Sequence, residues 1–208
     1  MILFSPPDSI GLERSSAGIK AARMTAGRKH PLLKQLLTLG TEEENVKPLY
    51  MHHPVLVTGV DTTAVLVRSL ILPLTKQRQL EAALAFQAEP FLPYPVEQAF
   101  LAYQITSKRR EQTELTLLAV RKEDIRAHVE SWQNQHIEPE KVSCVPSALC
   151  RFGATYLSTE GAYLIVHIGW QATTCVLVRE DKLLAAFGSP QGWEWLLKTQ
   201  QTEGRVSL

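Results

Sequence analysis

The amino-acid sequence predicts an α/β protein that contains a ferredoxin-like subdomain. Between Val65 and Val145 the hydrophobic periodicity gives the order strand, helix, strand, strand, helix, strand, which is that of a split βαβ unit. Two other segments, at residues 10–24 and 165–178, each predict a strand, a turn of small residues and a second strand. With 208 residues, of which 45% are hydrophobic, the chain is long enough for one or two domains with a substantial core.

The composition excludes several classes of protein. Lysine and arginine number 22 against 21 acidic residues, and a net charge of +1 gives no footprint for nucleic acid or an anionic membrane. The three cysteines, Cys144, Cys150 and Cys175, lack metal-binding spacing and are interpreted as reduced, buried thiols. No run of about 18 apolar residues predicts a membrane span, and the opening residues are too short for a signal peptide.

The first 72 residues predict a hairpin, one ambiguous segment and two further strands. Ile10–Met24 favours a hairpin, although a helix from Glu13 to Met24 is the alternative. In Gly27–Glu44, Pro31 can start a leucine-rich helix, or the segment is an ordered loop that leads to the next strand. Pro54–Val60 and Thr63–Leu72 are β-branched runs typical of strands.

A helix bent by prolines follows. Apolar residues at helical spacing start near Leu80, and the Thr75 hydroxyl is a plausible N-cap. Pro90 ends this helix, and two further prolines keep the backbone extended as far as a strand at Phe100–Ile105. We call residues 90–95 the proline elbow.

Strands and helices are also predicted for the rest of the chain. A strand at Glu114–Val120, an amphipathic helix at Lys122–His136 and a short strand at Val142–Val145 complete the predicted subdomain. The segments that follow are a helix and three strands: Pro146–Leu157, Ala162–Ile168, Thr174–Val178 and Leu183–Phe187.

Four stretches of the chain resemble the PilM family of type IV pilus assembly proteins and the related cytoplasmic part of type II secretion GspL. The opening IGLERSSAGIK resembles the family's IGLDIGSSSIK, and HIGWQATTCVLVREDKLL resembles its second hairpin. The elbow within RSLILPLTKQRQLEAALAFQAEPFLPYPVEQAFLAYQI is the most specific match. LLAVRKEDIRAHVESWQNQHIEPEKVSCVPSALCR resembles the strand, helix and return to the core that come next.

The resemblance implies an actin-like (ribonuclease H-like) α/β core with an inserted ferredoxin-like βαββαβ subdomain and a truncated second lobe. The expected domains are residues 1–64 with 143–160 for the core, 65–142 for the insertion, and 161–208 for the start of the second lobe. Relatives carry either a completed nucleotide lobe or a membrane helix further on.

The actin-like family holds nucleotide phosphates with backbone N–H groups of two hairpin turns, and a nearby acid positions the metal. The residues that the resemblance assigns to such a site are Glu13, Ser15, Ser16, Lys20, Gly169, Thr173 and Thr174.

Departures from the family pattern weaken this site. Ser15 replaces a turn glycine, which we expect to cost backbone strain, and His167 replaces an aspartate that holds Mg²⁺ through water. We therefore expect a degenerate ATPase with no catalytic residues and no bound metal, although residual binding of ATP and Mg²⁺ is left open. His30, His52 and His53 lack the spacing of metal ligands.

The resemblance implies a cytoplasmic scaffold, peripheral to the bacterial inner membrane, that binds a membrane-anchored PilN- or GspM-like protein and the secretion ATPase. A homodimer is allowed, and no nucleic acid is expected. Phe91, Leu92 and Tyr94 on the elbow are the candidate partner surface, with filling of an internal seam as the alternative. An actin-like ATP-binding protein or ATPase, and a division protein of the FtsA type, are the alternative functions.

Overall fold

The computed structural model describes residues 8–27, 30–40, 53–157 and 160–203, the side chains of 200–203 excepted. The chain forms two compact units, Met1–Val60 with Ala127–Ser143, and Asp61–Arg126 with Cys144–Leu208. The domain boundaries expected from the sequence stay a prediction.

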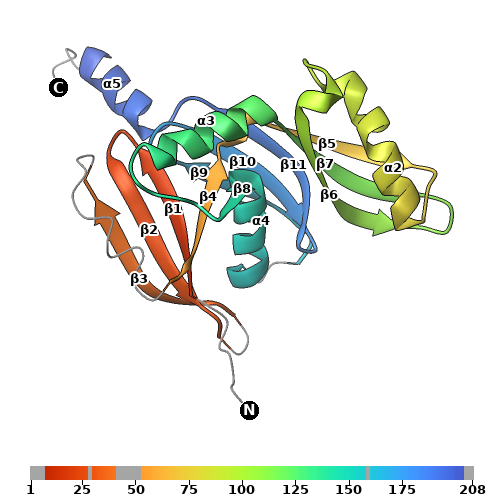
Figure 1. The fold of residues 1–208 in the computed structure, drawn as a ribbon, viewed down its shortest axis with the longest axis horizontal. Coiled ribbons are helices and arrows are strands. Elements are labelled where there is room, and N and C mark those ends of the chain that lie inside the picture. Colours follow the sequence, from red (N-terminus) through yellow and green to blue (C-terminus); the bar gives the residue numbers. More distant parts are fainter. Residues whose placement is uncertain (1–7, 28–29, 41–52, 158–159, 204–208) are drawn as a thin grey trace. The chain divides into compact units, whose positions relative to one another are not determined.

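The first unit is built on a five-stranded sheet with the order β3-β2-β1-β4-β8 (Figure 1). Strands β1 and β2 form an antiparallel hairpin, and β4 runs parallel to β1 on its other side. The strands are β1 (Ser9–Ser15), β2 (Gly18–Thr25), β3 (Leu32–Leu39), β4 (Val55–Val60) and β8 (Lys141–Cys144).

One face of this sheet is covered by the end of helix α3 (Lys122–Gln133) and the turn after it. Trp132 and Ile137 are fully buried against Ile10, Leu12 and Leu56. Because Ile10 and Leu12 alternate with exposed residues along β1, the strand presents an apolar side to the helix and a polar side to solvent.

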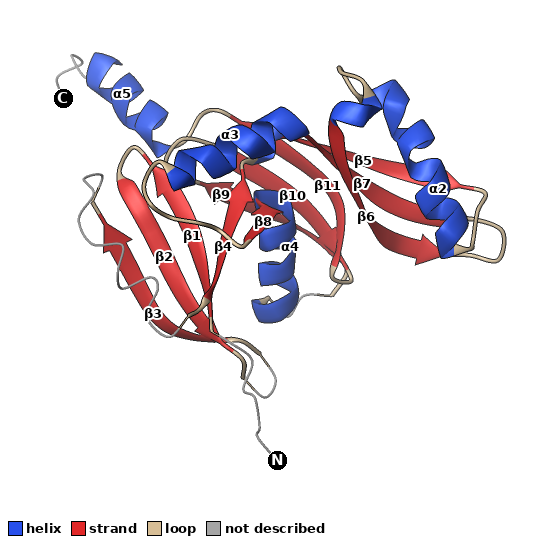
Figure 2. Cartoon of the chain, in the orientation of Figure 1, coloured by secondary structure: helices blue, strands red, loops and turns tan. Residues whose placement is uncertain are grey.

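The second unit contains a three-stranded antiparallel sheet with the order β5-β7-β6 (Figure 2). Helix α2 (Gln77–Ala88) lies across one face and packs Leu80, Leu84 and Ala88 onto the leucines of the strands. The strands are β5 (Val65–Leu72), β6 (Ala99–Lys108) and β7 (Thr113–Arg121). Three short 3₁₀ turns, Thr62–Ala64, Glu89–Phe91 and Val96–Gln98, flank these elements.

A second antiparallel sheet of this unit has the order β11-β10-β9. Its inner face packs on helix α4 (Val145–Tyr156) and on the other face of the β5-β7-β6 sheet, in a cluster that includes Val176, Val178 and Cys150. The elements are β9 (Ala162–Ile168), β10 (Thr173–Arg179), β11 (Lys182–Ser189) and the helix α5 (Trp193–Glu203).

Three sequence predictions need correction. Leu32–Leu39 is a strand rather than a helix or a loop, because pairing with β2 supplies its hydrogen bonds and Leu37 and Leu39 pack on the first unit's core. The N-cap of α2 is Lys76 and not Thr75, since the helix begins at Gln77. The predicted fourth strand of the insertion, β8, joins the five-stranded sheet, so the insertion's own sheet has three strands.

Most other elements are confirmed. Residues 9–25 form the predicted hairpin and not the alternative helix. Helix α2 gives way at Glu89 to a 3₁₀ turn that contains Pro90, as the elbow predicts, because proline cannot donate the next helical hydrogen bond. No helix in the described part of the chain is both long and apolar enough to cross a membrane.

Candidate functional site

The first predicted phosphate turn is a tight hairpin between β1 and β2. Ser15 pairs with Gly18 across a two-residue turn, and Glu13 lies directly opposite Lys20. Both of these charged side chains are exposed. The turn is closed locally, because Ser15 Oγ accepts a hydrogen bond of 3.2 Å from the Ala17 N–H.

The expected strain at Ser15 does not occur. The positive φ of this turn, +118°, falls on Gly18, and Ser15 is not among the described residues with positive φ. A Cβ at Gly18 would lie 2.4 Å from the Leu39 carbonyl oxygen. The hairpin therefore requires its glycine one step past the turn, where β3 approaches β2 closely.

The second predicted phosphate turn uses its hydroxyl groups within the protein. Thr173 Oγ1 donates to the Gln191 carbonyl at 2.6 Å. Thr174 is buried, and its Oγ1 lies 2.8 Å from Thr62 Oγ1. In this structure, both threonine hydroxyl groups thus make hydrogen bonds within the protein.

Helix α5 caps this second turn. The Trp193 N–H donates to the Gly169 carbonyl, and the Glu194 N–H donates to the Trp170 carbonyl, both at 2.9 Å. The helix start is so close that a Cβ at Gly192 would lie 2.5 Å from both carbonyl oxygens. The positive end of the helix is thus directed at carbonyl groups of the turn.

The predicted nucleotide-binding residues therefore lie in two separate groups, one on each hairpin. Glu13, Ser15, Ser16 and Lys20 lie together in the first unit. Gly169, Thr173 and Thr174 lie together in the second unit. His167 is opposite Thr174, at the position that Glu13 occupies opposite Lys20.

The proline elbow divides its three predicted partner residues. Phe91 is 43% exposed, whereas Leu92 packs against the cluster beneath α2. Tyr94 is half-buried, with its ring 5.8 Å from the Arg121 guanidinium carbon. Leu92 thus fills the interior of the insertion, and Phe91 and Tyr94 remain at the surface.

The elbow is extended by residues that the sequence reasoning missed. Phe100 is exposed beside the Lys122 ammonium, which lies 5.7 Å from its ring centroid. Burial, followed by the Asp124 charge, raises the pKa of Tyr94 above its ordinary value. We define the elbow surface as Phe91, Tyr94, Phe100, Arg121 and Lys122.

The pairing of β6 with β7 explains why these residues meet. Ala99 pairs with Arg121, and Phe100 pairs with Val120, two residues before Lys122. The alternation of Phe100 with Leu101 along the strand could have indicated an outward phenylalanine. The cross-strand register that brings the basic pair alongside was not readable from the sequence.

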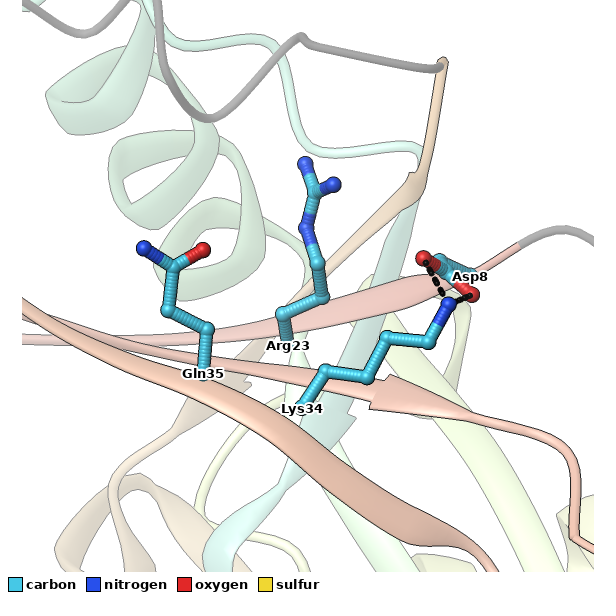
Figure 3. Close-up of a pocket in the computed structure, with 4 residues that line it drawn as sticks. All are labelled: Asp8, Arg23, Lys34 and Gln35. Carbon is cyan, nitrogen blue, oxygen red and sulfur yellow. Dashed lines mark hydrogen bonds and ion pairs between the residues drawn. The ribbon is translucent and has the colours of Figure 1, made fainter.

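A polar pocket of about 800 Å³ lies in the first unit (Figure 3). It is lined by Asp8, Arg23, Lys34 and Gln35, and Lys34 reaches both Asp8 carboxylate oxygens at 3.2 Å. Hydrogen bonds from Thr25 and Lys34 lower the pKa of Asp8 below its ordinary value. The lining side chains together carry one net positive charge.

Metal binding has no counterpart in the described residues, where no group of three or more His, Cys, Asp or Glu side chains is placed to hold an ion. His30 and His53 are exposed, and His52 lies outside the described residues.

Comparison with known proteins places the fold. Residues 45–188 match the family model described as type IV pilus assembly protein PilM. The chain is similar to a chain of a PilM–PilN type IV pilus biogenesis complex, with a TM-score of 0.75 and 20% identity over 96% of this chain and 66% of that chain.

The chain is also similar to the cytoplasmic domain of EpsL, an inner membrane component of the type II secretion system of Vibrio cholerae. The TM-score is 0.57, with 14% identity over 96% of this chain and 75% of that chain. No curated protein sequence matches the chain. The structural matches and the family match confirm the actin-like α/β fold class and the family resemblance.

Proposed function

Because the chain belongs to the PilM family of type IV pilus assembly proteins, we propose that it is a cytoplasmic scaffold of a type IV pilus or type II secretion inner-membrane platform. The observation that carries this proposal is the family match at residues 45–188, which includes the insertion, the elbow and most of the β9–β10–β11 sheet.

The proposed partner is the cytoplasmic tail of a membrane-anchored PilN- or GspM-like protein. Its support is the solved PilM–PilN complex, to which this chain is similar in fold. The elbow surface has the chemistry that suits such a tail, because the exposed rings of Phe91 and Phe100 can bind apolar side chains, and the Lys122 ammonium beside Phe100 can bind an acidic one. Arg121 is already paired with Glu123 at 3.0 Å.

A peptide titration tests this proposal. A synthetic peptide of the partner's cytoplasmic tail is titrated into the full chain by calorimetry. Phe91→Ala is expected to weaken binding about tenfold or more, because an aromatic anchor is removed from the surface. Phe86→Ala is the matched control, since Phe86 is 73% exposed on α2 and lies outside the elbow surface.

Two outcomes count against the elbow surface. If the peptide binds equally well to Phe91→Ala and to the unchanged chain, the tail docks elsewhere. If the peptide does not bind the unchanged chain, the scaffold proposal loses its main partner.

The scaffold is proposed to act without nucleotide turnover. The internal hydrogen bonds of Thr173 and Thr174, and the presence of His167 in place of a carboxylate, support this part of the proposal. ATP with Mg²⁺ at 100 times its dissociation constant would stabilise the fold by about 2.7 kcal/mol. A thermal shift of that size with ATP and Mg²⁺, absent with Mg²⁺ alone, would instead favour the ATP-binding alternative.

Contact with the secretion ATPase and self-association complete the proposed scaffold. The support is the likeness in fold to the cytoplasmic domain of EpsL, an inner membrane component of a type II secretion system. Co-purification of the secretion ATPase with the full chain tests the first contact, and retention of the ATPase by an unrelated protein of similar charge is the control.

A further inference from the structure

One end of the insertion carries a cluster of exposed basic side chains. Two of them lie at the start of α2, and three lie where β6 turns back into β7. We call this cluster the basic end, and its members are Lys76, Arg78, Lys108, Arg109 and Arg110. The proline elbow lies at the other end of α2 and of β6, about 26 Å away along the strand (Figure 1).

Hydrogen bonds bring the two basic segments together. The Thr113 hydroxyl donates to the Leu74 carbonyl at 2.7 Å, and Thr113 is the residue of β7 that pairs with Lys108. The Arg109 N–H donates to the Gln112 carbonyl at 2.8 Å and closes the turn. The loop before α2 and the β6–β7 turn therefore meet at one place (Figure 2).

The basic end has an excess of positive charge. The turn adds two acidic residues, Glu111 and Glu114, and the Arg109 guanidinium lies 3.2 Å from the Glu114 carboxylate. The first turn of α2 has no acidic residue, and Glu81 further along the helix accepts hydrogen bonds from two neighbouring side chains. The net charge of the five cations and the two acids is +3, and it is still +2 when Glu81 is included.

An exposed isoleucine adjoins the basic end. Ile71 is 62% exposed near the end of β5, and it pairs with Glu114, the residue that holds Arg109. Positive charge next to an exposed apolar side chain suits the boundary between the headgroups and the acyl chains of an anionic bilayer. A strongly acidic protein segment offers carboxylates to the cations but no apolar surface to Ile71.

We propose that the basic end binds the anionic phospholipid headgroups of the membrane on which the scaffold assembles. This inference rests on the proposed location at the inner membrane and adds the surface that faces the lipid. The net charge of the whole chain, +1, predicts no such contact, but only charges within about 8 Å of the bilayer are attracted strongly at physiological salt. Each lysine or arginine at an anionic surface strengthens binding about fivefold, so three net charges give roughly a hundredfold preference over a neutral bilayer.

A weak lipid contact is sufficient in combination with the tail. A tail that is anchored in the same membrane keeps the chain close to the bilayer, so the second contact forms at a high effective concentration. The elbow surface and the basic end can be engaged together, because they lie at opposite ends of the same strand.

Vesicle flotation of the full chain, with no tail peptide present, tests the proposal. Vesicles with about 30% phosphatidylglycerol in phosphatidylcholine are expected to bind the chain at least tenfold more tightly than phosphatidylcholine alone, at about 50 mM NaCl. About 500 mM NaCl is expected to abolish the difference, because salt screens exposed charges. Equal binding to both kinds of vesicle overturns the proposal.

Charge reversal defines the surface. The double variant Lys108→Glu with Arg110→Glu is expected to bind the anionic vesicles at least tenfold more weakly, with far-UV circular dichroism unchanged. The matched control is Arg151→Glu with Arg179→Glu, which changes the net charge equally at two exposed arginines of α4 and β10. The control is expected to bind like the unchanged chain. If both double variants lose binding equally, the net charge decides and the basic end is refuted as the lipid surface.

A soluble peptide of glutamates distinguishes lipid from an acidic protein. If this peptide binds the chain more tightly than the anionic vesicles do, and the Lys108→Glu, Arg110→Glu variant no longer binds it, the basic end is a protein surface and the proposal is refuted. The tail peptide is expected to bind this variant unchanged. Loss of lipid binding with tail binding intact removes only the present inference, whereas loss of tail binding with lipid binding intact removes only the proposed partner.

Discussion

The hairpins β1–β2 and β9–β10 are built in the same way and used differently. Each closes on a two-residue turn, between Ser15 and Gly18 in one and between Gly169 and Ala172 in the other. Counting from these turns, Leu12 of the first hairpin corresponds to Val166 of the second, and Ile10 corresponds to Leu164. The local sequence thus produces the same hairpin twice.

The difference lies in what covers the hairpins. Ile10 and Leu12 are 0% and 6% exposed, because Trp132 and Ile137 lie over them, and β4 pairs with the far side of β1. The corresponding residues of β9, Leu164 and Val166, lie on the face of the sheet that points away from α4 and are 60% and 54% exposed. The two hairpins thus differ in the burial of these equivalent side chains and not in how the hairpins form.

The chemistry at the turns differs as well. Glu13 and Lys20 form an exposed charged pair on the first hairpin, whereas His167 and buried Thr174 occupy the same positions on the second. A symmetric phosphate clamp would need similar donors on both turns. The two hairpins therefore share their backbone architecture and differ in the side chains at their turns.

The largest expected effect comes from removing the cover of the first hairpin. Trp132→Ala should lower the free energy of unfolding by about 3–5 kcal/mol, because a fully buried aromatic side chain is replaced by a cavity. Chemical denaturation monitored by circular dichroism measures the loss. Trp193→Ala, at a half-exposed tryptophan of α5, should cost far less. Similar losses for both variants would show that the cover of the first hairpin is not dominant.

A smaller loss is expected at the turn of the first hairpin. Gly18→Ala should destabilise by about 1–3 kcal/mol, since alanine disfavours φ near +118° and its Cβ would meet the Leu39 carbonyl. Gly11→Ala is the control in the same hairpin, because nothing lies within 4 Å of a Cβ there. Denaturant midpoints compare the two variants, and equal midpoints would refute the role given to Gly18.

Lowering the pH should reduce the free energy of unfolding by a still smaller amount, through His128 beneath the first hairpin. Trp132 Nε1 can only donate, and it lies 3.3 Å from His128 Nε2, so that nitrogen is the unprotonated acceptor. Thr58 Oγ1 lies 3.1 Å from the same nitrogen. Burial, and then the Arg14 charge, lower the pKa of His128 in the folded state. The unfolded chain therefore binds the proton more readily.

It follows that His128 contributes full stability above its ordinary pKa of about 6.5, and the contribution is lost as the pH falls below that value. Denaturation between pH 7.5 and 5 measures the slope. His128→Gln should flatten the slope in this window, because the titrating group is absent. An unchanged slope would assign the pH dependence to other groups.

The sequence predicted the strands and helices better than their partners. Both hairpins, the helix broken at Pro90 and the family were readable, since periodicity and proline act locally. The position of β8 was not readable, because it lies beside β4, a strand far away in the sequence. The strand state of Leu32–Leu39 was not readable either, because its leucine-rich sequence also fits a helix and the pairing with β2 decides between the two. The elbow site was half predicted, as Phe91 and Tyr94 were identified but Arg121 and Lys122 arrive through the β6–β7 register.

The smallest effect is expected on the exposed face of the second hairpin. Leu164→Thr should change the free energy of unfolding by no more than about 0.5 kcal/mol in dilute solution, because the side chain is already mostly exposed and threonine suits a strand. The corresponding change on the covered hairpin, Ile10→Thr, places a hydroxyl in a fully buried position and should cost several times more. Thermal denaturation at a few micromolar compares the two. A large loss for Leu164→Thr at that concentration would mean that the outer face is covered within a single chain, and the contrast between the hairpins would then rest on their turns alone.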